Sequence, residues 1–498
     1  MSTLRRRAFM GGIAAAVAGA AAGCTGPGPG NGNTSTPAST QSGGGGDVTD
    51  VTLEWWDHFQ ALGGVFEGLF DSFETDHPGV TVSRTQTNTN DQGRVLTLAR
   101  QGDGLPDVFT PVGLEYPIAR LVSDGWMQSL PLEESDLRAL PANTIFEGIT
   151  RFDGGIYSFP MFSPKQYNTT TWLNTELLAT TDHAPEDAET WEGFRRVALA
   201  AHQKGPGTGI VLPIGETGWL SAFAGELATT LGGWYSGNSP VEGGIDPRTG
   251  KYELNSDAFV EAIEFLQSLR TDGLVLPGSE SLDVLNSRAR WATGASAFYW
   301  DGPWNPGIVQ QNFPDFLDKI GVAHIPSPDA ESRAVYRRPA SGVFWVSSDT
   351  TNLELVAELL TLFATEDYYL QLANAMDQPP INAEVVADSD AIDAYKQAIV
   401  NYSEDVFIAP SAVVRNTAVS DVFATMEQPT PDLGNIIQGV LTDQIDDVRA
   451  TLTEYNDKLN SALEAAISEV ASTGVEVSGE DFVFDSWQPK QDFTPDMY

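Results

Sequence analysis

The spacing of apolar residues predicts alternating strands and helices in the first part of the chain. Residues 51–57 place apolar side chains at every second position, as a β-strand does. Residues 66–73 place them on one face of a helix, and a turn separates this helix from a second strand at Val80. A further turn over 102–107 leads into a short strand at Val108. Strands that alternate with helices favour an α/β fold with largely parallel sheets.

Helical spacing is sustained in the second half of the chain. Residues 259–269 and 355–363 each carry one apolar face, and a longer amphipathic stripe runs from 437 to 467. Residues 476–498 are acidic and aromatic with little period, so we expect them to form an extended tail packed on the folded body. A length of 498 residues exceeds what one hydrophobic core usually organises, which predicts two lobes.

The charge balance excludes one large class of partner. The chain has 68 acidic and 27 basic residues, of which seven are lysines, and its net charge is −41. Nucleic acid is excluded as a partner because binding to phosphate backbones needs clustered positive charge. Two interpretations of the acidity stay open, a solvated surface suited to high salt (a halophilic protein) and an ordinary acidic exported protein.

The first 50 residues read as a targeting segment and a tether. Within residues 1–23, Arg6 and Arg7 precede a weakly apolar run that is too short to span a bilayer, a pattern similar to a twin-arginine (Tat) signal. The run ends in Ala-Ala-Gly before Cys24, which resembles a lipobox and predicts lipidation of this single cysteine. Residues 24–50 are rich in Gly, Pro, Ser and Thr and predict a flexible tether. We therefore expect an exported lipoprotein on the outer face of the cell membrane; the alternative is a plain secretory leader with an incidental cysteine.

A series of short motifs follows one another through the body of the chain. They are LEWWD at 53–57, FETDHPGV at 73–80, GDGLPD at 102–107, FDGGIYSFP at 152–160, WLNTELL at 172–178, GASAFYWDGPW at 294–304 and GVAHIP at 321–326. Their order, from about residue 51 to 470, resembles the family 1 extracellular solute-binding proteins of ABC importers. The tail after residue 475 departs from the maltodextrin-binding members.

The resemblance implies a two-lobed Venus-flytrap α/β fold that holds its ligand between the lobes. It implies no enzymatic activity, no cofactor and no metal, and it implies a monomer whose partners are a small molecule, a sugar or polyol, and the membrane permease of an ABC importer. The implied lobes are 51–160 with 326–380, and 161–325 with 381–475. The three implied hinge crossovers fall near Pro160–Tyr167, Ile325–Pro328 and Gln378–Asn382.

Candidate ligand contacts come from the matched motifs and from the chemistry of sugars. A sugar site needs aromatic planes for C–H faces and polar groups for the hydroxyl rim. The candidates are Trp304, Trp56, Asp57, Glu115, Tyr116, Glu216, Trp219, Asp301, Phe162, Lys165, Tyr167 and Trp234, with His58, Tyr235, Ser341, Gly342 and Arg415 as further candidates by position. For each of them the competing role is core packing, and strand parity already predicts that Trp55 is core. Trp126, Trp172 and Trp191 are expected to be structural.

Other functions remain open at this stage. Anionic solutes such as glycerol phosphodiesters would use Arg337 and Arg338, and cationic solutes such as polyamines or betaines would use aromatic boxes and acids. A secreted glycoside hydrolase with two catalytic carboxylates is the rival enzyme class. The chain has no Gly-x-Ser-x-Gly elbow, His-Glu-x-x-His pair or P-loop.

Overall fold

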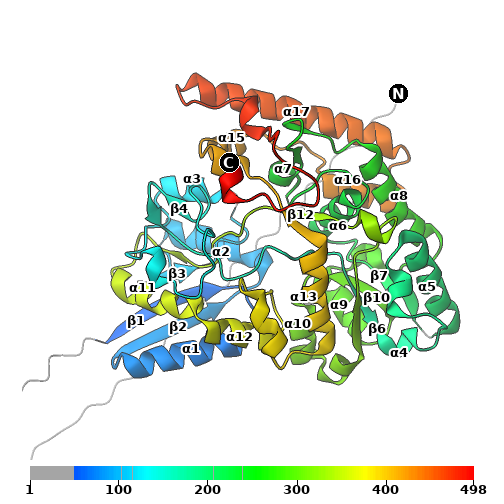
Figure 1. Ribbon diagram of the computed structural model, residues 1–498, viewed down its shortest axis with the longest axis horizontal. Helices are drawn as coiled ribbons and strands as arrows, with labels where there is room; N and C mark the ends of the chain where they lie inside the picture. The colour runs from blue at the N-terminus through cyan, green and yellow to red at the C-terminus, as the bar shows by residue number, and fades with distance from the viewer. Residues whose placement is uncertain (1–49, 103, 115, 206, 238) are drawn as a thin grey trace, which may run out of the picture. The chain divides into compact units, whose positions relative to one another are not determined.

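The computed structural model describes residues 50–102, 104–114, 116–205, 207–237 and 239–498 (Figure 1). The predicted export signal, the lipidation site Cys24, nearly all of the tether and the candidate contact Glu115 lie outside the described residues. No helix in the described part of the chain is long and apolar enough to cross a membrane.

The first sheet has the strand order β13-β3-β1-β2. Figure 1 labels β1, β2 and β3 of this sheet. Its strands are β1 (Val51–Asp57), β2 (Val80–Gln86), β3 (Val108–Phe109) and β13 (Trp345–Val346). β1 pairs in parallel with β2 and β3, and β13 pairs antiparallel with β3. The alternation that predicts β1 buries Leu53 and Trp55 beneath α1 (Gly63–Asp76), where the Phe70 ring lies 5.0 Å from that of Trp55. The predicted first strand and first helix are confirmed.

The second sheet has the strand order β11-β6-β10-β7. Its strands are β6 (Thr170–Asn174), β7 (Thr208–Val211), β10 (Ser296–Asp301) and β11 (Ile320–Ala323). β10 is parallel to β7, but β6 runs antiparallel to both β10 and β11, so the expectation of largely parallel sheets is wrong here. The reason is that the chain enters β6 from the other lobe, at the edge of the sheet where β10 ends.

Helices cover the second sheet and build the larger core. The main ones are α5 (Trp191–Lys204), α6 (Thr217–Thr229), α8 (Asp257–Thr271), α9 (Val284–Ala292), α16 (Leu433–Leu441) and α17 (Val448–Ser472). The stripe predicted over 437–467 is thus divided between two helices, and Asp443, between them, has a left-handed backbone with φ 57°. Both helices bury their apolar faces in the same core.

The remaining elements are shorter or peripheral. They are α2 (Thr89–Gln101), α3 (Ile118–Ser123), α4 (Thr175–Leu178), α7 (Pro240–Gly243), α10 (Asn305–Asn312), α11 (Leu353–Thr361), α12 (Glu366–Ala375), α13 (Asp393–Asp405), α14 (Ala412–Arg415), α15 (Val419–Thr425), β4 (Arg151–Phe152), β5 (Gly155–Ile156), β8 (Ile245–Asp246), β9 (Lys251–Tyr252), β12 (Val335–Arg337) and β14 (Val406–Ile408). With its two four-stranded sheets and their separate cores, the body is a two-lobed α/β fold.

Three passages of chain connect the lobes. The first and third pair with each other through their backbones, since Ser163 N donates to Pro379 O (2.8 Å) and Ile381 N donates to Met161 O (2.9 Å). In the second passage Val335 still packs in the core of the second lobe, whereas Phe344 belongs to the first. The chain therefore crosses after the predicted position at Ile325–Pro328.

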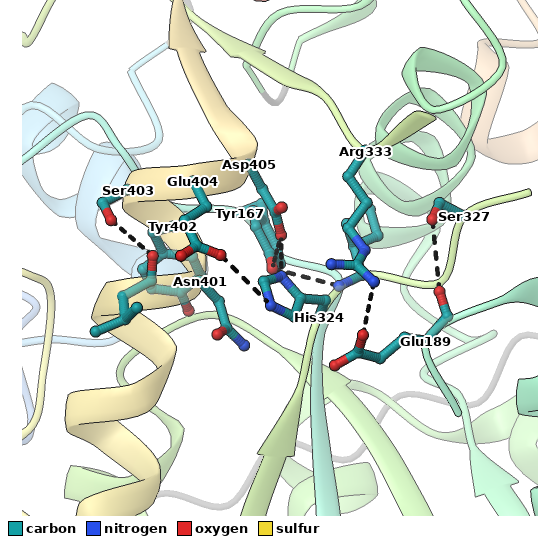
Figure 2. Close-up of polar contacts among 12 residues, drawn as sticks. Tyr167, Glu189, His324, Ser327, Arg333, Asn401, Tyr402, Ser403, Glu404 and Asp405 are labelled. Atoms are coloured by element: carbon teal, nitrogen blue, oxygen red, sulfur yellow. Dashed lines mark hydrogen bonds and ion pairs between the residues drawn. The ribbon is translucent and has the colours of Figure 1, made fainter. Parts of the chain in front are cut away.

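A buried polar network fixes the first passage to the second lobe (Figure 2). Asp405, the last residue of α13, accepts a hydrogen bond from the Tyr167 hydroxyl (3.0 Å) and lies 2.8 Å from His324 Nδ1. The same hydroxyl accepts a bond from Ile325 N (3.3 Å). Burial raises the pKa of Tyr167 well above its ordinary value, so its proton stays available for Asp405.

The tail covers a small aromatic cluster beside the paired strands β12 and β14. Trp487 packs edge-on against Trp234, with ring centroids 5.1 Å apart, and Phe493 N donates to Ile408 O (2.8 Å). The terminal Tyr498 hydroxyl accepts a hydrogen bond from Ser411 N (2.9 Å). Figure 1 shows this last segment in red next to β12.

Candidate functional site

A cavity of 1070 Å³ lies where strands of both sheets end. From the first lobe it is lined by residues that follow β1, β2 and β3, such as His58, Asn88 and Tyr116. From the second it is lined by residues that follow β7 and β10, such as Glu216 and Trp304. Ligands of open α/β sheets bind outside the carboxyl ends of the strands, which makes this cavity the candidate site.

Two tryptophans form an aromatic wall of the cavity. Trp304 stands at the first turn of α10 and Trp219 in the first turn of α6, and their rings meet edge-on with centroids 5.9 Å apart. Both rings are partly exposed. The Trp304 ring folds back over Gly302, where a Cβ atom would lie 2.3 Å from a ring carbon, so this position requires glycine. The wall offers the apolar surface on which a sugar face can stack.

Asp301 holds this wall in place from behind. It is fully buried and is not among the lining residues, so it orients Trp304 and has no direct access to a ligand. Its Oδ1 accepts bonds from Trp304 Nε1 (2.9 Å) and Gly302 N (2.8 Å), and its Oδ2 lies 2.6 Å from Arg288 Nη2. Sequence reasoning expected Asp301 at the rim; β10 ends in the core and keeps it inside.

Asp57 and Trp56 are also turned away from the cavity. Asp57 is fully buried and accepts two hydrogen bonds from Arg84, at 2.7 and 2.8 Å, because a carboxylate in the core needs a compensating charge. Trp56 packs against a separate cluster around Trp345. The next residue, His58, does line the cavity; burial lowers its pKa to about 4, so its imidazole is neutral at pH 7.

The remaining candidates divide between cavity and core. Tyr116 lines the cavity and is 54% exposed, and Tyr167 lines it with its hydroxyl already bound to Asp405. Phe162 is buried in the first core, with its ring edge-on to Phe59 at 5.3 Å. Two further candidates also lie outside the cavity. Lys165 pairs with Asp492 of the tail (2.8 Å), and the Trp234 ring stacks on that of Tyr336, with centroids 5.1 Å apart.

Among the further candidates, Ser341 lines the cavity, whereas Tyr235 is buried in the second core. Arg415 lies over the Phe484 ring of the tail, 3.7 Å from its centroid. Trp172 is fully buried and Trp191 stacks on Phe265, in keeping with structural roles.

Several charged lining residues were missed by sequence reasoning. They are Asp91, Glu242, Asp283, Arg288 and Asp377. Asp283 caps α9 by accepting from Asn286 N (2.7 Å), a local pattern that the sequence does carry. Asp377 follows Met376, whose left-handed backbone (φ 52°) ends α12 at the third passage. The feature of the sequence that could have indicated Asp377 is the crossover predicted at the neighbouring Gln378.

Each arginine of the cavity already has a carboxylate partner. Arg288 pairs with Asp301, Arg337 with the buried Glu226, and Arg338 with Glu242. Arg337 also donates to Gln166 O (2.8 Å). Across the residues that the structure describes, no cluster of three His, Cys, Asp or Glu side chains could hold a metal ion.

The profile of the family described as bacterial extracellular solute-binding protein matches residues 56–369. A search of curated protein sequences gives no match. Solved structures share the fold at low identity, among them the following three. The GacH receptor of Streptomyces glaucescens is 18% identical with a TM-score of 0.60, over 83% of this chain and 99% of that one.

The other two structures come from Thermotoga species. The maltose-bound MalE3 of T. maritima is 17% identical with a TM-score of 0.61, over 82% of this chain and 99% of that one. A solute-binding protein of an ABC transporter from Thermotoga lettingae, bound to α-D-tagatose, is 17% identical with a TM-score of 0.61, over 83% and 100%. At these identities the likeness shows the fold.

Proposed function

Because the chain belongs to the bacterial extracellular solute-binding protein family, we propose that it captures a sugar or a related polyol between its lobes and delivers it to an ABC importer. The observation that carries the proposal is the wall of Trp304 and Trp219 at the carboxyl ends of the second sheet. Beside it, Glu216 offers carboxylate oxygens for a hydroxyl rim. The maltose and tagatose bound in two structural neighbours support the same class of ligand.

Capture works by differential affinity for two arrangements of the lobes. The cavity draws His58 and Tyr116 from the first lobe and Trp304 and Trp219 from the second. A ligand that contacts both sets stabilises the arrangement in which they are close together. The permease then recognises that arrangement, and no catalytic step is part of the proposal.

An anionic solute is the less favoured alternative. A phosphodiester would need a cation that is free to bind it, but Arg337 and Arg338 are engaged by Glu226 and Glu242. This pairing supports a neutral or a cationic ligand instead.

The proposed location of the protein is the outer face of the cell membrane. Export through the twin-arginine pattern and lipidation of Cys24 would leave residues 24–50 as the tether of the folded body. Replacing Cys24 with Ala is expected to move the protein from the membrane fraction into the medium. Retention of the variant in the membrane fraction would contradict the anchor.

The acidic composition suits a saline medium. With 68 acidic against 27 basic residues, like charges repel one another at low ionic strength, and salt screens this repulsion. The free energy of unfolding is expected to rise between about 0.1 M and 2 M salt; a salt-independent stability would remove this part of the proposal.

The capture proposal is tested by titrating a panel of sugars, polyols, phosphodiesters and betaines at high salt, by calorimetry. Trp304→Ala is expected to weaken binding of the best ligand by about 10-fold or more with little change in melting temperature. Trp191→Ala is the matched control, because Trp191 stacks on Phe265 away from the cavity; it should lower stability and leave affinity unchanged. Equal affinities for wild type and Trp304→Ala would show that the wall has been misidentified.

A further inference from the structure

The carboxyl group of Asp377 lies in the cavity without a direct ion-pair partner among the described residues. Asp377 lines the cavity at the third passage and is 4% exposed. Its Oδ1 accepts a hydrogen bond from Gln378 N (2.7 Å), and within the described residues its Oδ2 has neither a hydrogen-bond donor nor an ion-pair partner. Burial raises its pKa to about 6, which the Gln378 N–H and the charge of Arg288 only partly offset.

Two other lining carboxylates share this lack of a cation. Glu216 accepts a bond from the backbone of Val284 (2.9 Å), and Asp283 accepts bonds from Asn286. No Lys, Arg or His of the described chain forms an ion pair with either of them. The arginines that line the same cavity are each neutralised by a carboxylate, as described above. The uncompensated charge of the cavity is therefore negative.

The aromatic wall adds to this preference. The faces of indole rings carry negative electrostatic potential and attract cations. Trp304 and Trp219 present partly exposed rings to the same cavity as Asp377 and Glu216. A cationic group on a ligand would find both a charge partner and an aromatic face, while an anionic group would find neither.

On the premise of the proposed function, we propose that the preferred ligand is a carbohydrate that bears a basic amino group, whose ammonium binds the carboxylate of Asp377. The amine supplies the charge and the N–H donors that Oδ2 lacks. The corresponding sugar with a hydroxyl at that position binds more weakly, and uronic acids and sugar phosphates are rejected. An isolated buried carboxylate is costly to keep, which is expected where it is reserved for a ligand.

The test is a matched series of oligosaccharides with one backbone and three substituents at C2. Glucosamine, N-acetylglucosamine and glucose oligomers of equal length and β-1,4 linkage are titrated at pH 7 by calorimetry, with oligogalacturonate as the anionic arm. Wild type is expected to bind the glucosamine oligomer at least about 10-fold more tightly than the glucose oligomer, about 1.4 kcal/mol, and to give no signal with oligogalacturonate.

Asp377→Asn is expected to reduce that preference to less than about 3-fold, because the neutral amide keeps the shape and loses the charge. In the absence of ligand the same variant should melt at a higher temperature than wild type at pH 7, since an uncompensated buried charge has been removed. Asp390→Asn is the matched control; Asp390 is an exposed carboxylate on the segment that follows the third passage. It should leave preference and melting temperature unchanged.

The outcomes separate the two proposals. Equal binding of the amine and hydroxyl oligomers, with sensitivity to Trp304→Ala, overturns the amine preference and leaves sugar capture standing. Tight binding of the anionic oligomer also overturns it. Absence of binding by every carbohydrate in the series overturns the amine preference, and the proposed function falls with it only if the wider panel of sugars and polyols also shows no binding.

Discussion

Strands β1 and β10 both end in Trp-Asp, and the two endings are built alike but used differently. Each aspartate is fully buried and paired with an arginine, Asp57 with Arg84 and Asp301 with Arg288. Each also accepts a bond from a backbone N–H just beyond the strand. Each also accepts a bond from an indole, and in this bond the two endings differ.

The difference lies in which tryptophan supplies the indole. Asp57 accepts from Trp55, which precedes it and is buried in the first core (3.1 Å). Asp301 accepts from Trp304, which follows it and faces the cavity (2.9 Å). At the end of β1 this hydrogen-bonded cluster around the aspartate anchors the strand in the core. At the end of β10 the corresponding cluster orients an aromatic ring toward the cavity, because the indole comes from the next helix.

Removing either aspartate is expected to have the largest effect. Asp57→Ala leaves the partly buried Arg84 without its counter-charge and Asp301→Ala leaves the buried Arg288 without its own, and each should lower the free energy of unfolding by about 3–5 kcal/mol. Denaturant titration measures this loss. Only Asp301→Ala should also weaken ligand binding, because only this variant removes the hydrogen bond that orients Trp304. Equal affinities of the two variants would mean that Asp301 does not orient the Trp304 ring.

The residues that follow the two aspartates predict a difference in stability that depends on pH and is smaller than the effect of removing an aspartate. His58 follows Asp57, and burial lowers its pKa from the ordinary 6.5 to about 4. As the pH falls from 6.5 toward 4, His58 of the unfolded chain binds a proton that His58 of the folded chain does not. The free energy of unfolding therefore decreases, by about 2–3 kcal/mol near pH 4.5. His58→Gln should remove this share of the acid sensitivity.

The measurement compares wild type and His58→Gln by denaturant unfolding at pH 7 and pH 4.5. The residue after Asp301 is Gly302, which has no titratable side chain. The end of β10 therefore has no counterpart to the loss of stability that His58 causes at low pH. A wild-type minus variant difference that stays constant with pH would show that His58 is not held neutral.

Replacing the indoles by phenyl rings is expected to have the smallest effect. Trp55→Phe and Trp304→Phe each lose one hydrogen bond to a carboxylate, about 1–2 kcal/mol. Trp55→Phe should show this loss in stability alone, whereas Trp304→Phe should also weaken ligand binding by about 3-fold. Denaturant titration measures the loss of stability and calorimetric titration measures the loss of affinity. A change of affinity in Trp55→Phe would contradict the different roles of the two indoles.

Local patterns in the sequence were sufficient for the strand-helix units and part of the site. The alternation over β1 and the apolar face of α1 are properties of neighbouring residues, and both predictions are confirmed. Trp304 and Trp219 lie at the start of the helices that follow β10 and β7, and the family resemblance of their motifs indicated them as candidate contacts. The direction of β6 was not predictable from periodicity, because it depends on where the chain re-enters the sheet.

Contacts between distant segments explain the candidates that lie outside the cavity. Lys165 is drawn to Asp492 and Trp234 is covered by Trp487, both partners in the tail. No spacing rule links residues so far apart in the chain. Asp377 was missed for a related reason. The burial of its carboxylate and the lack of a partner for Oδ2 depend on how distant segments pack around it. The sequence at that position shows only an aspartate beside a predicted crossover.

The tail has a consequence for how the protein is made. Trp234 and Tyr336 are buried in a cluster whose other members include Phe484, Trp487 and Phe493. A chain emerges from the ribosome N-terminus first, so these two aromatic residues remain uncovered until synthesis is nearly finished. A premature stop codon within the final segment would therefore release a polypeptide with an exposed aromatic patch, a target for chaperones and a seed for aggregation.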